Sequence, residues 1–383
     1  MKYFLWTLRV IIGVLFIFSG LLKANDPMGL VYKMDEFFEV WNMNFMTQYS
    51  FFMSVLMIAF EFICGVAVLL GYSFRLFSTL LLLLSIFFTF LTGYALFSGK
   101  VKECGCFGTC IKLSNIATFN KDLVLLVLAG ILFAYRGRIH GVFQRHVNTA
   151  LMILATVFVS GLQWWVLEHL PIAGSGLPFK DCLPYKAGNN LMQKMQPGAD
   201  YKPAVITSVF IYEKGGQKKE FTQDNYPWQD TTWKFVDRKD KVISEAAGEP
   251  EVHDFILTDS DHNDQTQAIL GAKGYTFLWF VRQTDKAHTD KMDVLAALAA
   301  QATALHIPFY ILYSDNVESA MPFLKKWHLD KWNALSLDYT ASKTALRTNP
   351  GLMLLNDGTV VNKWSYRDYP TGITLNNGKL ETK

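Results

Sequence analysis

The stretch that decides the fold is Tyr3–Leu22, YFLWTLRVIIGVLFIFSGLL, in which Arg9 is the only charged residue. A helix needs about 20 mostly apolar residues to cross the hydrocarbon of a bilayer. A cleaved signal peptide is the competing interpretation. However, the run is long for one, no small-x-small cleavage site precedes Lys23, and more apolar runs follow. The stretch therefore predicts an uncleaved first transmembrane helix.

Four further apolar runs repeat this pattern along the first half of the chain. They predict spans over Ser50–Gly71, Phe74–Phe97, a segment from Ser114 or Asn115 to Tyr135, and Asn148–Leu167. The fourth run holds only about 13 apolar residues after Leu123, so its helix must begin earlier, at an N-cap Ser114 or Asn115. Lys121 and Asp122 would then turn inward or pair. Trp164-Trp165 predicts an interfacial anchor at the end of the fifth span.

The chain changes character after about residue 170. From there it has the charges, turns and alternating strands of an ordinary soluble domain. The formal net charge of +3 is small and evenly spread, which argues against a nucleic-acid partner. We expect a membrane domain over residues 1–170, a linker and β-hairpin region over 171–249, and an α/β domain over 250–383.

The linker and hairpin region begins with Pro178–Leu191, which predicts a polar, turn-rich connection. Two hairpins are expected after it. The first pairs Val205–Tyr212 with Gln217–Thr222 over Gly215-Gly216, and the second pairs Thr232–Val236 with Lys241–Ser244 over Asp237–Asp240.

Beyond Pro250, strand and helix patterns alternate. Predicted strands are Tyr275–Arg282, Pro308–Tyr313, Gly351–Leu355 and Thr359–Trp364, and predicted helices are Asp293–Leu305 and Ser319–Trp327. Strands that alternate with helices indicate an α/β fold. The last two strands form a hairpin over Asn356-Asp357-Gly358.

Three of the five cysteines, Cys104, Cys106 and Cys110, lie in the short loop after the third span. Cysteines separated by one residue close only a small, strained ring, which suits a labile disulfide. Clustered thiols outside a packed core therefore favour redox chemistry. A structural disulfide and a metal site are the alternatives, although three thiolates still need a fourth ligand.

Glu61 lies in the middle of the second span. An isolated carboxylate in a membrane is costly, so it should face the bundle interior and meet a cation. Arg9 and Lys23 of the first span are the candidates. A structural ion pair and a proton or quinone site are both open interpretations of this group. Cys64, three residues further on, should be inert.

Two spans together resemble a family. Arg9-x3-Gly13-x2-Phe16-x2-Ser19-Gly20-x2-Lys23-x2-Asp26-Pro27-x-Gly29 looks like the first helix of the DoxX family, and Glu61-x3-Gly65-x3-Leu69-Leu70-Gly71-x3-Arg75 resembles its second. The Cys104–Gly108 loop followed by Lys121-Asp122 is similar to the branch that approaches MauE. The resemblance covers about residues 5–135. It implies a four-helix core, to which the fifth span is added, and a bacterial inner-membrane location. It also implies a redox connection, because DoxX-type subunits occur in a thiosulfate:quinone oxidoreductase. MauE-type proteins are associated with disulfide formation in a periplasmic enzyme.

Residues 250–370 resemble a membrane-tethered thioredoxin-like domain. The segment Thr348-Asn349-Pro350-Gly351 matches the family's position before the final hairpin, where the proline is cis. The resemblance therefore implies that Pro350 is cis and faces the segment after the first strand. Thioredoxins carry Cys-x-x-Cys there, whereas this chain has Asp285-Lys286-Ala287-His288. Without a thiolate the domain cannot attack a disulfide, and His288 is expected to be a solvated residue.

The orientation rests on a close comparison of basic residues. Arg136, Arg138 and Arg145 between the last two spans, with Arg75 between the second and third, predict a cytoplasmic side. The opposite loops hold nearly as many lysines. A cysteine cluster that can oxidise fits the periplasm, so the Cys104–Gly108 loop and the soluble domain are placed there.

Four cysteines, Cys104, Cys106, Cys110 and Cys182, would then share the periplasmic side. Cys104 or Cys106 is the expected exchanging thiol, Cys110 or its neighbour resolves it, and Cys182 is the shuttle or a structural partner. Two functions follow. One is thiol–disulfide exchange with a periplasmic protein, with electrons passing to a quinone near Glu61, Arg9 and Lys23. The other is a non-enzymatic, lipid-embedded assembly protein with a structural disulfide.

Overall fold

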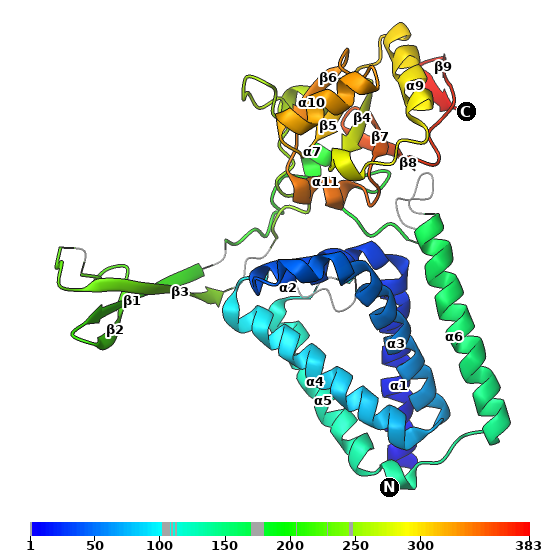
Figure 1. Ribbon diagram of the computed structural model, residues 1–383, viewed down its shortest axis with the longest axis vertical. Helices are drawn as coiled ribbons and strands as arrows, with labels where there is room; N and C mark the ends of the chain where they lie inside the picture. The colour runs from blue at the N-terminus through cyan, green and yellow to red at the C-terminus, as the bar shows by residue number, and fades with distance from the viewer. Residues whose placement is uncertain are drawn as a thin grey trace.

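The computed structural model describes residues 2–101, 108, 110, 111, 113–169, 180–203, 205–227, 229–244 and 248–383. Figure 1 shows a helical region, an α/β domain beyond one end of its helices, and a small sheet that stands away to one side. The N-terminus lies at the far end of the helices, and the C-terminus lies in the α/β domain.

Five helices in the described part of the chain are long and apolar enough to cross a membrane, as predicted. They are α1 (Lys2–Asn25), α3 (Ser50–Leu70), α4 (Phe74–Ser98), α5 (Asn115–Ala134) and α6 (Arg145–Glu168). Ser114 caps α5 by accepting a hydrogen bond from the Ala117 amide at 3.2 Å. Asp122 is buried and pairs with Lys121 at 2.6 Å, so the short fourth span does extend back to Ser114.

Close approach of α1 and α3 forms the centre of the helical region. A Cβ added to Gly65 would lie 2.8 Å from the backbone nitrogen of Ile17, and one on Gly13 would lie 3.0 Å from the Gly65 oxygen. Larger residues would push these backbones apart, so the two glycines allow the contact. Helices α4 and α5 pack together, and α6 lies along α3 and α1.

The helix α2 (Pro27–Val40) was not among the predicted elements. Asp26 is its N-cap and accepts from the Gly29 amide at 3.1 Å, and Pro27 occupies the first turn. Both are standard signals for a helix start. The helix lies between the spans and the α/β domain (Figure 1). A 3₁₀ turn, η1 (Asn44–Tyr49), then leads into α3.

The small sheet has the order β2-β1-β3 and is antiparallel throughout. Its strands are β1 (Val205–Lys214), β2 (Gln217–Thr222) and β3 (Lys234–Ser244). The first predicted hairpin is confirmed, with Gly215 and Gly216 at φ +61° and +81°. The second is wrong: Asp237 and Asp240 lie inside β3, opposite Ile211 and Ser208. A charged run resembles a turn because an exposed strand lacks the apolar alternation on which the prediction depends.

The α/β domain is built on a five-stranded sheet of order β6-β5-β4-β7-β8. Its strands are β4 (Tyr275–Val281), β5 (Phe309–Tyr313), β6 (Asn333–Ser336), β7 (Gly351–Asn356) and β8 (Thr359–Ser365). The helical elements of the domain are α7 (Leu191–Lys194), α8 (Thr266–Leu270), η3 (Thr284–Lys286), α9 (Met292–Ala304), α10 (Val317–Lys326) and α11 (Tyr339–Ala345). A separate two-stranded hairpin consists of β9 (Ile373–Asn376) and β10 (Lys379–Thr382). Strands β4, β5 and β6 are parallel, and β7 and β8 are antiparallel to their neighbours. This βαβ unit followed by a β-hairpin is the predicted thioredoxin-like arrangement.

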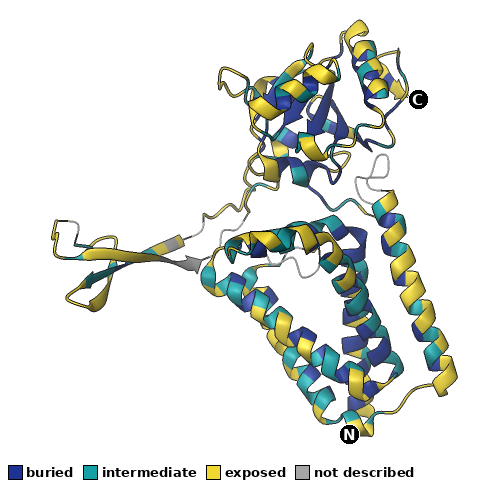
Figure 2. Ribbon diagram, in the orientation of Figure 1, coloured by how far each residue is buried: buried dark blue, intermediate teal, exposed yellow. Residues whose placement is uncertain are grey.

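Each face of the sheet has its own core. Phe277 and Trp279 of β4 point to one core, and Leu278 and Phe280 point to the other. Figure 2 shows the buried strands between more exposed helices. The second core also takes in Tyr185, which packs against Phe255. The connection before β1 is thus part of this domain and not merely a polar linker; Pro178 at its start lies outside the described residues.

Candidate functional site at the domain junction

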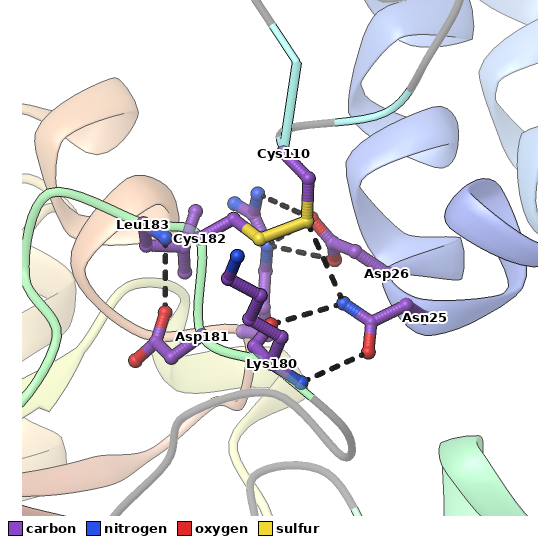
Figure 3. Close-up of a disulfide and its surroundings, with 8 residues drawn as sticks. Asn25, Asp26, Cys110, Lys180, Asp181, Cys182 and Leu183 are labelled. Carbon is purple, nitrogen blue, oxygen red and sulfur yellow. Dashed lines mark hydrogen bonds and ion pairs between the residues drawn. A yellow bond between two sulfur atoms is a disulfide. The ribbon is translucent and has the colours of Figure 1, made fainter.

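A disulfide joins the membrane region to the chain that enters the α/β domain. Cys110, five residues before α5, is bonded to Cys182, with 4.8 Å between their Cα atoms (Figure 3). Both residues are half-buried. The predicted external thiols Cys104 and Cys106 lie outside the described residues, so their positions relative to this bond stay predictions.

The end of α1 positions both sides of the disulfide. The Asn25 side-chain nitrogen donates to the Lys180 carbonyl at 3.0 Å and lies 4.0 Å from the Cys110 sulfur. The Lys180 amide returns a bond to the Asn25 oxygen at 3.3 Å (Figure 3). Gly108, at φ +63°, lies so close to α1 that an added Cβ would be 3.3 Å from the Leu22 oxygen. Gly108 and Cys110 therefore lie against the last turn of α1.

A buried ion pair begins at Asp26, the residue after Asn25. The Arg347 guanidinium donates to both Asp26 oxygens, from Nε at 3.0 Å and Nη2 at 2.8 Å. Their side chains are 4% and 1% exposed. Burial alone would lower the pKa of Arg347, but the Asp26 carboxylate outweighs it and raises the pKa above its usual value. A Cβ on Gly29 would lie 2.5 Å from Asp26 Oδ2, so a larger residue there would displace the carboxylate.

A second buried ion pair involves the residue directly before Cys182. Lys363 of β8, with a fully buried side chain, donates to Asp181 at 2.6 Å. Burial lowers the pKa of Lys363 even though Asp181 favours its charged form. Asp181 directly precedes Cys182, and Asp26 directly follows Asn25. Two ion pairs with the α/β domain therefore lie next to the residues that hold the disulfide, and their charges interact with one another.

Of the two predicted partners of Glu61, Arg9 and Lys23, the structure shows Lys23. The Lys23 ammonium lies 2.8 and 2.7 Å from the two carboxylate oxygens, and it also donates to Ser19 at 2.9 Å. Both charged side chains are 3% exposed, so Glu61 faces inward as predicted. Arg9 is not part of this cluster: it donates to the His140 carbonyl at 3.2 Å, near the α3–α4 turn. Cys64 is buried and forms no disulfide with any described residue.

An apolar cavity of about 970 Å³ opens beside the disulfide, between α1 and α6. Cys110, Asn25 and Lys180 form its polar end, and its apolar wall consists of Phe18, Leu21, Leu22, Val157, Phe158, Leu162 and Trp165. A site of this kind can accept a lipid-soluble molecule next to the sulfur atoms.

The usual thioredoxin thiol position holds no cysteine. The Asn349–Pro350 bond is cis, as predicted. The His288 amide donates to the Asn349 carbonyl at 3.1 Å, and Asn349 donates to the Gln283 carbonyl at 2.8 Å. Pro350 thus follows directly on the residue that binds the Asp285–His288 segment. The His288 ring is exposed and stacks on Tyr366 at 4.1 Å.

Two parts of the chain match family models. Residues 1–135 match the family model of methylamine utilisation protein MauE, and residues 206–245 match a domain of unknown function, DUF8463. No curated protein matches the chain. A solution structure of a thiol:disulfide interchange protein from Bacteroides sp. has 16% identity and a TM-score of 0.24, covering 28% of this chain and 75% of that one. The chain is thus a multi-pass membrane protein with a MauE-like membrane region, and its thioredoxin-like fold rests on the sheet topology.

Four residues of the junction were absent from the predicted site: Asp26, Asp181, Arg347 and Lys363. Asp26 belongs to the motif that indicated the family, and its role as an N-cap was readable. Its contact with a residue 321 positions away was not. In the part of the chain that the structure describes, no group of three or more His, Cys, Asp or Glu residues could hold a metal ion.

Proposed function

From a MauE-like membrane region joined by a disulfide to a thioredoxin-like domain, we propose that this protein carries out thiol–disulfide exchange at a membrane surface. Cys110 and Cys182 are the internal redox pair, and Cys104 and Cys106 exchange with it. The observation that carries the proposal is the position of the Cys110–Cys182 bond at the polar end of the α1–α6 cavity. The loop thiols are only four and six residues from Cys110.

The exchange proceeds in two sulfur transfers. A thiolate of Cys106 or Cys104 attacks the Cys110 sulfur, the Cys110–Cys182 bond breaks, and Cys182 leaves as a thiolate. The second loop thiolate attacks the mixed disulfide, closes the Cys104–Cys106 bond and releases Cys110. A dithiol of a partner protein reduces the loop disulfide and becomes oxidised. Two electrons and two protons thereby move from the partner to the Cys110–Cys182 pair.

The electron acceptor we propose is a quinone in the α1–α6 cavity. Its lining is apolar except for Asn25, Cys110 and Lys180, which fits a ring with two carbonyl groups on a lipid-soluble tail. A quinone supplies oxidation by taking two electrons and two protons, which restores the disulfide. Lys23 lies two residues before Asn25 in α1, and its buried partner Glu61 lies in α3. This ion pair would hold charge near the end of α1.

Quinone-dependent oxidation of dithiothreitol by the purified full-length protein tests this function. A short-chain quinone should be consumed by the wild type and by Cys64→Ala, whose thiol is buried in α3. Cys110→Ser should abolish the consumption. Cys106→Ser should leave an unresolved Cys104–Cys110 disulfide within the chain, which peptide mapping of the non-reduced protein detects. Equal turnover in Cys110→Ser and wild type would refute the exchange.

A structural role for the disulfide is the second candidate. The buried Asp26–Arg347 and Asp181–Lys363 pairs near the bond favour a static clip that holds the α/β domain against α1. The chain would then be a membrane-anchored assembly protein. In that case the bond resists mild reductant, and no quinone is consumed.

We propose a bacterial inner-membrane location with the α/β domain in the periplasm. The Val142 amide donates to the Leu70 carbonyl at 2.9 Å, so the α5–α6 connection with Arg136 and Arg138 lies beside the α3–α4 turn, at the end of the bundle away from the α/β domain. The arginines gathered at this end of the bundle support its placement on the cytoplasmic side. Impermeant alkylation of Arg138→Cys in whole cells should fail, whereas Lys273→Cys should be labelled.

A further inference from the structure

A second cavity, of about 810 Å³, lies on another face of α6, enclosed by α2, α3 and the α/β domain. Its floor is formed by the first turns of α3 and the last turns of α6, with Phe51, Val55, Leu56, Ala59, Trp164 and Leu167. Phe51, Leu56 and Trp164 are 49%, 51% and 68% exposed, so this floor continues to the lipid-facing surface. It belongs to the membrane leaflet beside the α/β domain.

The side of this cavity formed by the α/β domain is cationic. Arg282, Lys286 and Arg367 line it. Arg282 donates to the Leu346 carbonyl at 2.6 Å and to the Tyr32 hydroxyl at 3.3 Å, but it forms an ion pair with none of the described residues. Glu168 is the acidic lining residue and lies 3.7 Å from Arg367. The cavity thus carries an excess of positive charge next to an apolar floor.

A buried amide in the wall has no partner. Gln163 of α6 is 1% exposed, lines the cavity, and has neither its side-chain nitrogen nor its oxygen bonded to any described group. The Thr348 hydroxyl, also on the lining, is likewise unpaired within the described structure. Leaving such groups without partners in an apolar site is costly. The wall therefore points to a ligand with its own hydrogen-bonding groups.

We propose that this cavity binds an anionic phospholipid. Its acyl chains lie on the α3–α6 floor, its phosphate meets Arg282 and Lys286, and its ester and glycerol oxygens meet Gln163 and Thr348. Each part of the cavity matches one part of that molecule: apolar below, polar in the middle and cationic at the level of the headgroup. The inference stands apart from thiol exchange, because none of its residues is a cysteine and the cavity lies on a different face of α6.

Native mass spectrometry of the full-length protein released from detergent tests this site. Phosphatidylglycerol should be retained as one bound molecule in preference to phosphatidylcholine with the same chains. Lys286→Gln should reduce that preference about fivefold, the loss expected for one cation near a charged headgroup. Lys286 is exposed, so its removal leaves folding intact. Lys273→Gln, an equal charge change at the opposite end of β4, should keep the wild-type preference.

Two further experiments test whether the α3–α6 floor holds acyl chains and whether a soluble phosphate can replace the lipid. Ala59→Phe fills the floor and should reduce retention of both lipids. Millimolar glycerol phosphate should not displace phosphatidylglycerol, because a soluble phosphate lacks the acyl chains. Equal retention of the two lipids, an equal loss in Lys273→Gln, or displacement by glycerol phosphate would each overturn the proposal.

Discussion

Two loops on either side of α6 could each hold a redox thiol, and they differ in a consistent way. The loop after β4 carries Asp285 and His288 where thioredoxins carry cysteines, and its backbone still binds the Asn349 that precedes cis Pro350. In the segment before α5, by contrast, Cys110 lies in a disulfide with Cys182. The α/β fold is thus retained without its usual thiol, while a thiol pair is built at the membrane junction. A fold by itself does not carry its chemistry.

The largest expected effect comes from breaking the ion pair that supports the junction. Arg347→Met leaves the Asp26 carboxylate buried without its cation, which costs about 3–5 kcal/mol. Urea titration of the full-length protein in detergent, followed by tryptophan fluorescence, measures the free energy of unfolding. The double variant Asp26→Leu/Arg347→Met removes both charges and should recover much of the loss. If the single variant were as stable as wild type, the pair would not hold the junction.

Removal of the disulfide should cost somewhat less. Cys182→Ser opens a loop defined by a sequence separation of 72, for which a loss of about 2–4 kcal/mol in unfolding free energy is typical. The same titration measures it. Wild type with strong reductant is the matched control and should shift equally. A larger loss in Cys182→Ser than in reduced wild type would mean that the thiol packs in a way that the serine cannot.

Much of this architecture was readable from the sequence because it follows from local patterns. Apolar runs predicted the five spans, and Ser114 or Asn115 was predicted to start α5. The cost of an intramembrane carboxylate required Glu61 to face inward. These signals need only neighbouring residues or a single physical rule. The cis Asn349–Pro350 bond is different, because only the resemblance to thioredoxin-like domains implied it.

The junction itself was out of reach for the opposite reason. Arg347 and Asp26 are 321 residues apart, and Lys363 and Asp181 are 182 apart. No periodicity links such positions, and each charge alone suggests a solvated surface. The β3 error has the same origin, because Asp237 and Asp240 owe their strand conformation to pairing with β1 and not to their own pattern.

The free energy of unfolding should also depend on pH through Lys363, the buried partner of Asp181 at the junction. Burial lowers its folded pKa below the usual 10.5, so the unfolded chain binds the extra proton between these two values. Unfolding free energy should therefore rise with pH across that window, by at most about 1.4 kcal/mol per unit. Titrations on the alkaline side, up to the usual pKa of 10.5, measure the slope. Asp181→Leu/Lys363→Met lacks the group and should lack this part of the slope; an identical slope would exclude Lys363 as its source.

The smallest effect should come from returning thiols to the loop after β4. Asp285→Cys/His288→Cys places two cysteines where the Asn349 contacts hold the segment, and oxidation should join them if their Cα atoms lie about 4.4–6.8 Å apart. Peptide mapping of the non-reduced protein detects the bond, and Asp285→Cys alone is the control. Quinone consumption at the junction should stay at the wild-type level, because Cys110, which is bonded to Cys182, lines the cavity at the other face of α6. A crosslink that raised this rate would show that the two loops exchange electrons. No crosslink at all would mean that the Asp285–His288 segment does not correspond to the thioredoxin thiol position.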